Sequence, residues 1–476
     1  MSRIENYESF DAMGLAELVA KGDASPEDLL ETAIAVAEER NPKLNAIVIP
    51  MYDEARDAIR RGLPKGPFRG VPFLLKDLHL GYTGVRTTYG SKLFADFVAD
   101  HDSELVIRYN QSGLVSFGKT HSPEFGLTTT SETDLFGQTS NPWDLGRTAG
   151  GSSGGASSAV AGGIVPAANA SDGGGSIRIP AACCGIVGLK PTRARNPAGP
   201  DAGEGWGGMS TAHVVSRSVR DTAALLDATH GPDLGDPYCA PAPDRPYLSE
   251  LDRSPGKLRI AVQTATFNGA PTHADCVTAV EQTAALCRDL GHAVEEASLE
   301  VGAEVLGGAT RTIIAANIRA VVEDRARALG REPAQGDVEL GTWALAELAR
   351  TFGAADYARA VRTIHGVGRQ VSRFFEPYDV LLTPTMATPP LELGRLSLSR
   401  ADDPTAYVAD LNQTIGFTSL FNASGHPAIS LPLHWSASGL PIGLQFAGRF
   451  GDEGALLRLS GQLEEARPWF DRTPPR

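Results

Sequence analysis

Residues 150–192 read GGSSGGASSAVAGGIVPAANASDGGGSIRIPAACCGIVGLKPT, and this stretch decides how the rest of the chain is interpreted. Two glycine clusters carry serines, Ser152 and Ser153 in the first and Ser176 in the second, and the segment between them is too apolar to be a linker. Glycine loses backbone entropy wherever it is ordered, so such clusters indicate left-handed backbone or main-chain amides that closely approach another group. We interpret the stretch as a candidate active site built around serine.

The two clusters have different local predictions. Small residues after the first cluster predict a helix over 156–163, whose N-terminal amides would supply a positive potential near the serines. The second cluster, 172–176, predicts a tight loop whose successive amides converge on an oxyanion, with Ser176 at its end. A glycine turn that serves only packing is the alternative for this loop.

An upstream lysine extends the site. Residues 70–78 read GVPFLLKDL and predict a strand entered from a loop, in which alternation places Lys76 on one face with Leu74 and Leu78. Burial of a lysine lowers its pKa and leaves a neutral amine, which is a base. The alternative is a lysine that packs its stem and extends its ammonium into water, or one that pairs with a carboxylate.

A rival interpretation rests on residues 113–120, GLVSFGKT, which match the P-loop pattern GxxxxGK[ST] by letters. A P-loop needs flexible residues between its glycines and a helix directly afterwards. Bulky residues fill this gap and Pro123 follows, so we predict a strand over 114–117. A nucleotide-binding protein remains the rival hypothesis of another class.

Elsewhere, apolar periodicity predicts alternating helices and strands, and hence an α/β fold. A helix over 29–39 begins with the capping residues Ser25, Pro26 and Asp28 and is expected to end at Asn41 and Pro42. Further helices are predicted over 101–112, 218–229, 274–290 and 453–465, and strands over 258–262, 292–294, 379–382, 428–431 and 440–446. We expect one domain over 1–476: a helical N-terminal part (1–65), a catalytic core (66–230) and a helical insertion (300–376) that selects the substrate.

Composition excludes several classes of partner. The chain has 476 residues with 42% hydrophobic and 21% charged content, and its net charge of −14 provides no basic surface for nucleic acid or an anionic membrane. Its five cysteines form no CxxC pair, and its ten histidines show no metal-ligand spacing, so neither a disulfide framework nor a metal site is predicted. The polar N-terminus lacks a signal sequence, so we expect a soluble, cytoplasmic protein.

Taken together, the motifs resemble those of the amidase signature family. They are GVPFLLKD at 70–77, GKTHSPEF at 118–125, NPWD at 141–144, GGSSGG at 150–155, DGGGSIRIP at 172–180, GLKPT at 188–192 and GLPIGLQF at 439–446. The resemblance implies a single large mixed β-sheet with helices on both sides, and catalysis by a Ser–cis-Ser–Lys triad.

By motif position, the resemblance makes Ser176 the nucleophile, Ser152 the bridging serine and Lys76 the base. It also implies that the peptide bond between Gly151 and Ser152 is cis. The amides of Gly173, Gly174, Gly175 and Ser176 would bind the oxyanion, and Asp172, Arg178, Ser153 and Gly151 would support the site. We expect Asp172 and Arg178 to shape the loop rather than to react.

The function implied by the resemblance is hydrolysis of C–N bonds through an acyl-enzyme, without a cofactor. Three segments, 66–78, 216–227 and 235–247, are similar to the branch that contains nylon-oligomer hydrolases, and related amidases cleave urethanes. This suggests small linear or cyclic amides, anilides or carbamates with uncharged ends as substrates of a monomer or homodimer. The alternative within the family is the glutaminase subunit of a tRNA-dependent amidotransferase.

Overall fold

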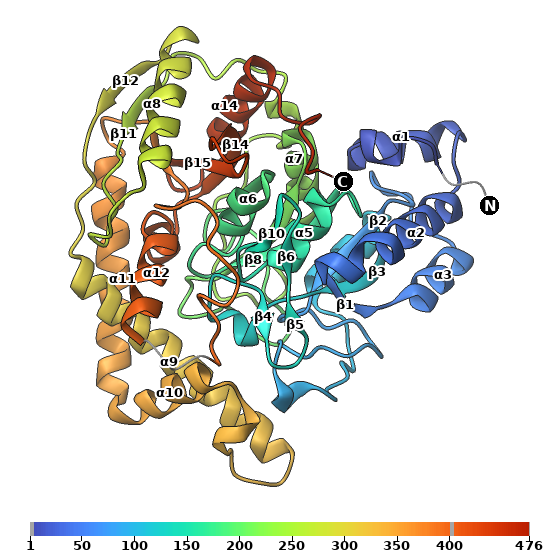
Figure 1. Cartoon of the computed structure of the whole chain (residues 1–476), viewed down its shortest axis with the longest axis horizontal. Coiled ribbons are helices and arrows are strands. Elements are labelled where there is room, and N and C mark those ends of the chain that lie inside the picture. Colours follow the sequence, from blue (N-terminus) through green and yellow to red (C-terminus); the bar gives the residue numbers. More distant parts are fainter. Residues whose placement is uncertain (1–3, 400–403, 476) are drawn as a thin grey trace.

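A mixed eight-stranded β-sheet is the centre of the fold in the computed structural model, which describes residues 4–399 and 404–475 (Figure 1). The strand order is β12-β11-β13-β15-β14-β9-β10-β8. These strands are β8 Ala167–Asp172, β9 Val187–Lys190, β10 Thr211–Ser216, β11 Arg259–Val262, β12 Ala293–Glu296, β13 Val380–Pro384, β14 Ala428–Trp435 and β15 Pro441–Gly448. β11 is parallel to β12 and β13, and the other neighbouring pairs are antiparallel, so the predicted mixed sheet is confirmed.

Helices cover both faces of this sheet, as predicted. Successive strand residues point to opposite faces, and Leu382 of β13 packs in a core with α7 (Val219–Thr229), α8 (Ala274–Asp289) and α14 (Glu453–Ala466). The adjacent Leu381 packs instead in a core with α9 (Ala303–Ala328), α11 (Ala354–Phe374) and α13 (Ser419–Ser424). The sheet is therefore buried on both sides.

Three N-terminal strands pair separately from the large sheet, in the order β1-β3-β2. They are β1 (Ile47–Pro50), β2 (Pro72–Lys76) and β3 (Val115–Thr120), with β2 parallel to β3. β2 lies beside β8, and the Lys76 amide donates to Asn169 Oδ1 across the gap at 3.3 Å. The predicted strand that carries Lys76 thus joins the two sheets at the site. Short pairs also form between β4 Glu132–Thr133 and β5 Gly137–Gln138, and between β6 Ser140–Asn141 and β7 Asp144–Thr148.

The N-terminal part is helical, with α1 (Ala12–Lys21), α2 (Pro26–Leu44) and α3 (Tyr52–Arg61). The predicted start of α2 is confirmed by a capping box between Ser25 and Asp28. The predicted end at Asn41 and Pro42 is wrong, because α2 continues to Leu44 and is capped by Asn45 in left-handed backbone. Asn41 instead uses its side chain to accept hydrogen bonds from the amides that follow the helix, at 2.8 Å.

Helices α4 (Glu104–Gln111), α5 (Gly154–Ala161) and α6 (Arg178–Cys184) lie within residues 66–230, the predicted catalytic core. α5 packs against β8, and α6 packs against β9, β14 and β15. A Cβ on Gly155 would lie 2.4 Å from the main-chain nitrogen of His121, the residue that follows β3. Glycine at this position therefore allows α5 to lie close to the end of β3. Short 3₁₀ turns occur at Tyr7–Ser9, Lys92–Phe94, Glu124–Gly126, Leu248–Glu250, Gln335–Asp337 and Ala349–Thr351.

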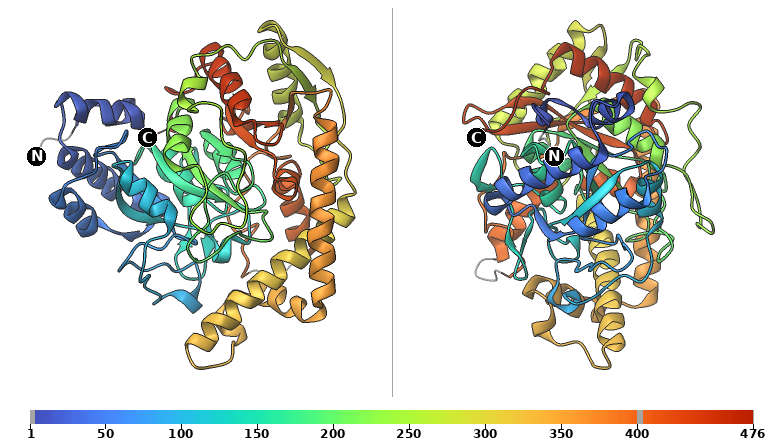
Figure 2. Two further views of the ribbon diagram at one scale, coloured as in Figure 1. Left: turned by 180° about the vertical axis from the view of Figure 1, so that it is seen from behind. Right: turned by 90° about the vertical axis from the view of Figure 1, so that its right-hand side faces the viewer.

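The region 303–374 is helical, as predicted, and extends beyond the sheet (Figure 2). It comprises α9 (Ala303–Ala328), α10 (Leu340–Leu348) and α11 (Ala354–Phe374), and α9 and α11 pack side by side. Helix α12 (Pro404–Ile415) follows. By length and composition alone α9 is apolar enough to cross a membrane, and 33% of its most apolar 18-residue window is buried.

Candidate active site

Lys76 is the most unusual group at the junction of the two sheets. It ends β2, its side chain is completely buried, and its Nζ lies 2.7 Å from Ser152 Oγ, 2.9 Å from Ser153 Oγ and 3.0 Å from Ser171 Oγ. The predicted apolar face is real, but the amine itself meets three hydroxyl groups. The alternative of an ammonium that reaches water is therefore wrong.

Electrostatics favour the neutral form of this amine. Burial lowers the pKa of Lys76 to about 7, although the negative charge of Asp172 opposes the shift. A neutral amine donates two N–H groups and accepts one hydrogen bond with its lone pair. Since the Ser153 hydroxyl donates to the Ser171 carbonyl at 3.2 Å, its proton is already used. Ser152 has the shortest contact with Nζ and is the best placed hydroxyl to donate to the lone pair.

Ser152 follows a cis peptide bond from Gly151, as the family resemblance implied. The bond lies where the chain enters α5, and Ser153 occupies the position before the first helical residue. A Cβ on Gly151 would lie 2.5 Å from the nitrogen and the oxygen of Thr130, so the main chain of a neighbouring loop presses on the glycine. This close contact explains why a residue without a side chain precedes the serine.

The loop after β8 holds Ser176, whose residue is 8% exposed. Within 4–399 and 404–475 its hydroxyl has no hydrogen-bond partner, so the contact to Ser152 that a proton relay requires is not formed in this structure. In the same described ranges the amides of Gly173, Gly174 and Ser176 also lack acceptors. The loop therefore presents several free donors beside a free hydroxyl group.

The Gly175 amide behaves differently from its neighbours. It donates to Asp172 Oδ1 at 2.7 Å, which leaves it unavailable to a substrate oxygen. Asp172 Oδ2 accepts from the Ile177 amide at 3.1 Å in the same way. In this structure the Gly175 amide therefore orients the loop, and its predicted role as an oxyanion donor requires this hydrogen bond to Asp172 to open.

Asp172 and Arg178 form a completely buried bidentate ion pair, with both hydrogen bonds at 2.9 Å. Burial by itself would raise the pKa of Asp172, but the charge and hydrogen bonds of Arg178 outweigh it and lower that pKa. The pair joins the end of β8 to the start of α6 across the loop. That these two residues support the loop rather than react stays a prediction.

Arg178 is also bound by three residues that the sequence analysis missed. It donates to the Thr418 carbonyl at 3.0 Å, to Gln445 Oε1 at 2.7 Å and to Asn422 Oδ1 at 2.7 Å. The Thr418 hydroxyl also donates to the Gly174 carbonyl at 2.7 Å. Gln445 lies within the motif at 439–446, which could have drawn attention to it, but nothing in the sequence marked the other two residues.

Ser171 is the other missed residue, although it directly precedes the predicted loop.

The P-loop interpretation is wrong, because 115–120 form the buried strand β3. Lys119 does not reach a phosphate site: its buried Nζ donates to the Leu80 carbonyl at 3.0 Å and to the Thr87 hydroxyl. Its pKa falls to about 8, chiefly because the amine is buried.

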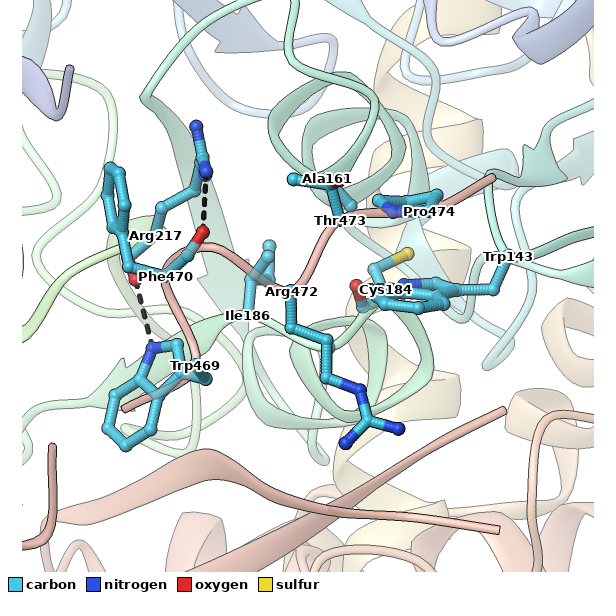
Figure 3. Close-up of a pocket in the computed structure, with 11 residues that line it drawn as sticks. Trp143, Ala161, Cys184, Ile186, Arg217, Trp469, Phe470, Arg472, Thr473 and Pro474 are labelled. Carbon is cyan, nitrogen blue, oxygen red and sulfur yellow. Dashed lines mark hydrogen bonds between the residues drawn. The ribbon is translucent and has the colours of Figure 1, made fainter. Parts of the chain in front are cut away.

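Two cavities elsewhere carry no comparable chemistry. One of about 10 Å³, the size of a single water molecule, lies where the C-terminal segment packs on Trp143 and Cys184 (Figure 3). The other, of about 390 Å³, is lined by Arg108 and Asp227. Arg108 donates to main-chain carbonyls after α7, and Asp227 accepts from two amides, so both charged groups already have partners.

The comparisons with known proteins agree with this geometry. Residues 28–457 match the family model described as Amidase. The chain is 39% identical over 485 residues to the 6-aminohexanoate-cyclic-dimer hydrolase of Paenarthrobacter ureafaciens, covering 100% of this chain and 98% of the relative. A solved structure of a 6-aminohexanoate cyclic dimer hydrolase superposes with a TM-score of 0.93 at 38% identity, over 98% of this chain and 99% of the other.

A bacterial aryl acylamidase of the amidase signature family is also similar, with a TM-score of 0.89 at 29% identity and coverage of 97% and 96%. The chain therefore belongs to the amidase signature family. It is an enzyme that hydrolyses amide C–N bonds, and the predicted family and reaction class are confirmed.

Proposed function

We propose that the protein hydrolyses small uncharged amides, anilides or carbamates through a triad of Ser176, Ser152 and Lys76. The observation that supports this most directly is the 2.7 Å contact between the buried Lys76 amine and Ser152 Oγ. A buried amine with a pKa near 7 is half neutral at neutral pH and can accept a proton there.

In the proposed first half-reaction, Lys76 Nζ takes the proton of the Ser152 hydroxyl while Ser152 takes the proton of Ser176. Ser176 Oγ forms a bond to the carbonyl carbon, and the oxyanion is bound by the amides of Gly173, Gly174 and Ser176. The contact between Ser152 and Ser176 then forms with substrate present, since catalytic hydrogen bonds are often long in the unliganded enzyme.

Collapse of the tetrahedral intermediate breaks the C–N bond. The proton stored on Lys76 passes through Ser152 to the leaving nitrogen, which departs as a neutral amine and leaves an acyl group on Ser176. Water then gives a proton to the same relay and attacks the acyl carbon, which releases the acid and restores the Ser176 hydroxyl. The cycle uses no external oxidant or reductant.

The proposed substrate class rests on the relatives. Their names specify a cyclic dimer of 6-aminohexanoate and aryl acylamides, which are uncharged amides of non-peptide type. Carbamates carry the same scissile C–N bond, so we extend the proposal to urethanes. We also propose a cytoplasmic location, which is supported by the unpaired state of all five cysteines.

Covalent trapping tests this function. We expect a fluorophosphonate, which reacts with activated serines, to add one label per chain, and peptide mass spectrometry to place it on Ser176. Ser176→Ala should remain unlabelled and Ser152→Ala should label much more slowly. Labelling of Ser152 or Ser153 instead would contradict the assignment of the nucleophile.

A substrate panel separates the two functions within the family. It contains nylon-type amides, anilides, carbamates and free glutamine, assayed with the isolated chain. Preference for the synthetic amides supports the proposed function. Exclusive glutamine turnover would support the amidotransferase alternative. Size-exclusion chromatography of the same sample distinguishes a monomer from a homodimer.

A further inference from the structure

Trp206 has a backbone conformation that bulky residues rarely adopt. It is a central residue of the turn in which the Gly208 amide donates to the Gly205 carbonyl at 3.1 Å. Both central residues have positive φ angles, 51° at Trp206 and 63° at Gly207, and such turns favour asparagine and glycine. A tryptophan here strains the backbone, and proteins retain such strain mostly where function requires it. The conformation therefore marks the indole as a candidate for a functional role.

The turn is held against Asp172, where the loop after β8 begins. Asn422 Nδ2 donates to the Met209 carbonyl at 3.2 Å and to Asp172 Oδ1 at 2.8 Å, so one side chain joins the turn to the loop. Arg193 Nε donates to the Gly208 carbonyl at 2.6 Å. The position of the turn is therefore fixed by the same carboxylate that orients the loop.

The indole ring of Trp206 lies on the main chain of this loop. A Cβ on Gly173 would be 2.7 Å and 2.8 Å from two carbon atoms of the six-membered ring, so the ring covers this glycine. A Cβ on Gly174, by contrast, would meet no atom of another described residue within 4 Å, apart from its chain neighbours. The amides of these two glycines are proposed oxyanion donors. The ring thus borders open space where the carbonyl of the substrate is expected.

Trp206 is only partly buried, as are Gly173 and Gly174. Its side chain packs against the core that contains Ile313 of α9 and Phe421 of α13. Trp469, which packs in the core on the opposite face of the sheet, is only 4% exposed. The indole of Trp206 is therefore held by the core on one side and keeps accessible apolar surface beside the loop.

We propose that Trp206 is a specificity-determining residue that stacks on an aryl group attached to the scissile amide or carbamate. This inference rests on the proposed function. Aromatic pairs gain from the interaction of their ring quadrupoles in addition to the apolar area that they bury. A saturated ring of the same size buries similar area without this gain, so the indole favours the aryl substrate.

Two pairs of matched substrates test this inference. In the first pair, hexanoic acid is joined to aniline or to cyclohexylamine. In the second pair, butylamine is joined to benzoic acid or to cyclohexanecarboxylic acid. Trp206→Leu keeps an apolar side chain without a ring and should lower the aryl-to-cyclohexyl ratio of kcat/KM in one pair about 3–10-fold, the size of a single aromatic pair. The affected pair shows on which side of the scissile bond the indole lies.

Trp206→Phe retains an aromatic ring and should keep most of the preference for the aryl substrate. Trp435→Leu is the matched control, because Trp435 is also partly buried but packs against Trp143 and Arg472, and both ratios should stay at their wild-type values. Melting temperatures show whether each variant is folded. The fall in kcat/KM on the acid side of the pH profile, its acid limb, should be unchanged, because the proposed base Lys76 determines it.

Equal losses on both members of each pair, unchanged ratios, or a shifted acid limb in Trp206→Leu would overturn the inference. Binding makes the test independent of turnover: in a Ser176→Ala background, calorimetry should show that Trp206→Leu weakens the aryl amide about 3–10-fold more than its cyclohexyl partner. Equal weakening, or no binding of either aryl amide when Trp206 is present, would also overturn it. Should the wild type cleave none of the four amides, the proposed function fails, and the binding difference still decides the role of Trp206.

Discussion

The loop after β8, which carries the proposed nucleophile Ser176, and the helical region at 303–374 use charged groups in opposite ways. At the two ends of this loop, Asp172 and Arg178 are completely buried and bind each other, and the same carboxylate orients two main-chain amides. In the helical region, ion pairs such as Arg350 with Glu347 lie on the surface, and even an apolar residue, Val305, is 65% exposed. Buried contacts therefore fix the geometry of the loop, whereas the ion pairs of the helical region stay in contact with solvent.

A short chain of contacts nevertheless joins the two regions. A Cβ on Gly173 of the loop would lie 2.7 Å from the Trp206 ring. A Cβ on the following Gly207 would lie 3.4 Å from Ile313 of α9 and 3.8 Å from the Tyr357 hydroxyl of α11. We propose that substrate selection by the helical insertion acts through these residues.

The largest expected effect is on kcat, and it should be confined to the loop after β8 and the lysine beside it. Ser176→Ala should lower kcat by about 10⁴-fold or more, because removal of a nucleophile disables the whole relay, while the melting temperature stays unchanged. Lys76→Met should approach the same loss. Arg350→Ala is the control from the helical region and should retain full activity. Steady-state kinetics with an anilide measure all three, and substantial turnover by Ser176→Ala would falsify the triad.

The next effect is on stability. Arg178→Met leaves the Asp172 carboxylate buried without its partner and should reduce the free energy of unfolding by about 3–5 kcal/mol. Arg350→Ala breaks an exposed pair and should change it by about 1 kcal/mol or less. Urea unfolding followed by circular dichroism compares the two. Equal changes would mean that the buried pair is not what holds the loop.

The pH dependence provides the third effect. Protonation of Lys76 removes the base, so kcat/KM should be constant above about pH 7 and fall about tenfold for each pH unit below it. Variants in the helical region should show the same fall in kcat/KM below about pH 7. Rates with a neutral anilide between pH 5 and pH 9 test this expectation, and a flat profile down to pH 5 would show that another base acts.

The smallest expected effect lies at the contact between the regions. Tyr357→Ala should change the ratio of kcat/KM for an anilide and an alkyl amide by about tenfold, which is the scale expected when a pocket loses apolar contact. The acid limb and the melting temperature should stay close to wild type. If the ratio is unchanged, the helical insertion does not select substrate through this contact.

Local sequence predicted much of the fold. The capping box at Ser25 and Asp28, the strand that ends at Lys76 and the loop at 172–176 all depend on neighbouring residues, and all three are present. The predicted helix end at Pro42 is wrong, because Pro42 lies in the last turn of a helix that continues to Leu44. Asn41 then accepts hydrogen bonds from the Ala46 and Ile47 amides just beyond the helix end. Helix α6 was missed because it contains Pro180 and lies between glycines, at 173–175 and at Gly185.

Neighbouring residues were enough to predict the proposed reactive groups: an apolar strand with one lysine, and two glycine clusters with serines, restrict the backbone within a few residues. How these groups are held depends on contacts between distant parts of the folded chain. Thr418, Gln445 and Asn422 reach Arg178 from 240 or more positions along the chain, and Ser171 meets Lys76 across two sheets. Contacts of this kind leave no periodic signal, because burial and hydrogen bonding depend on proximity in space rather than on spacing in sequence.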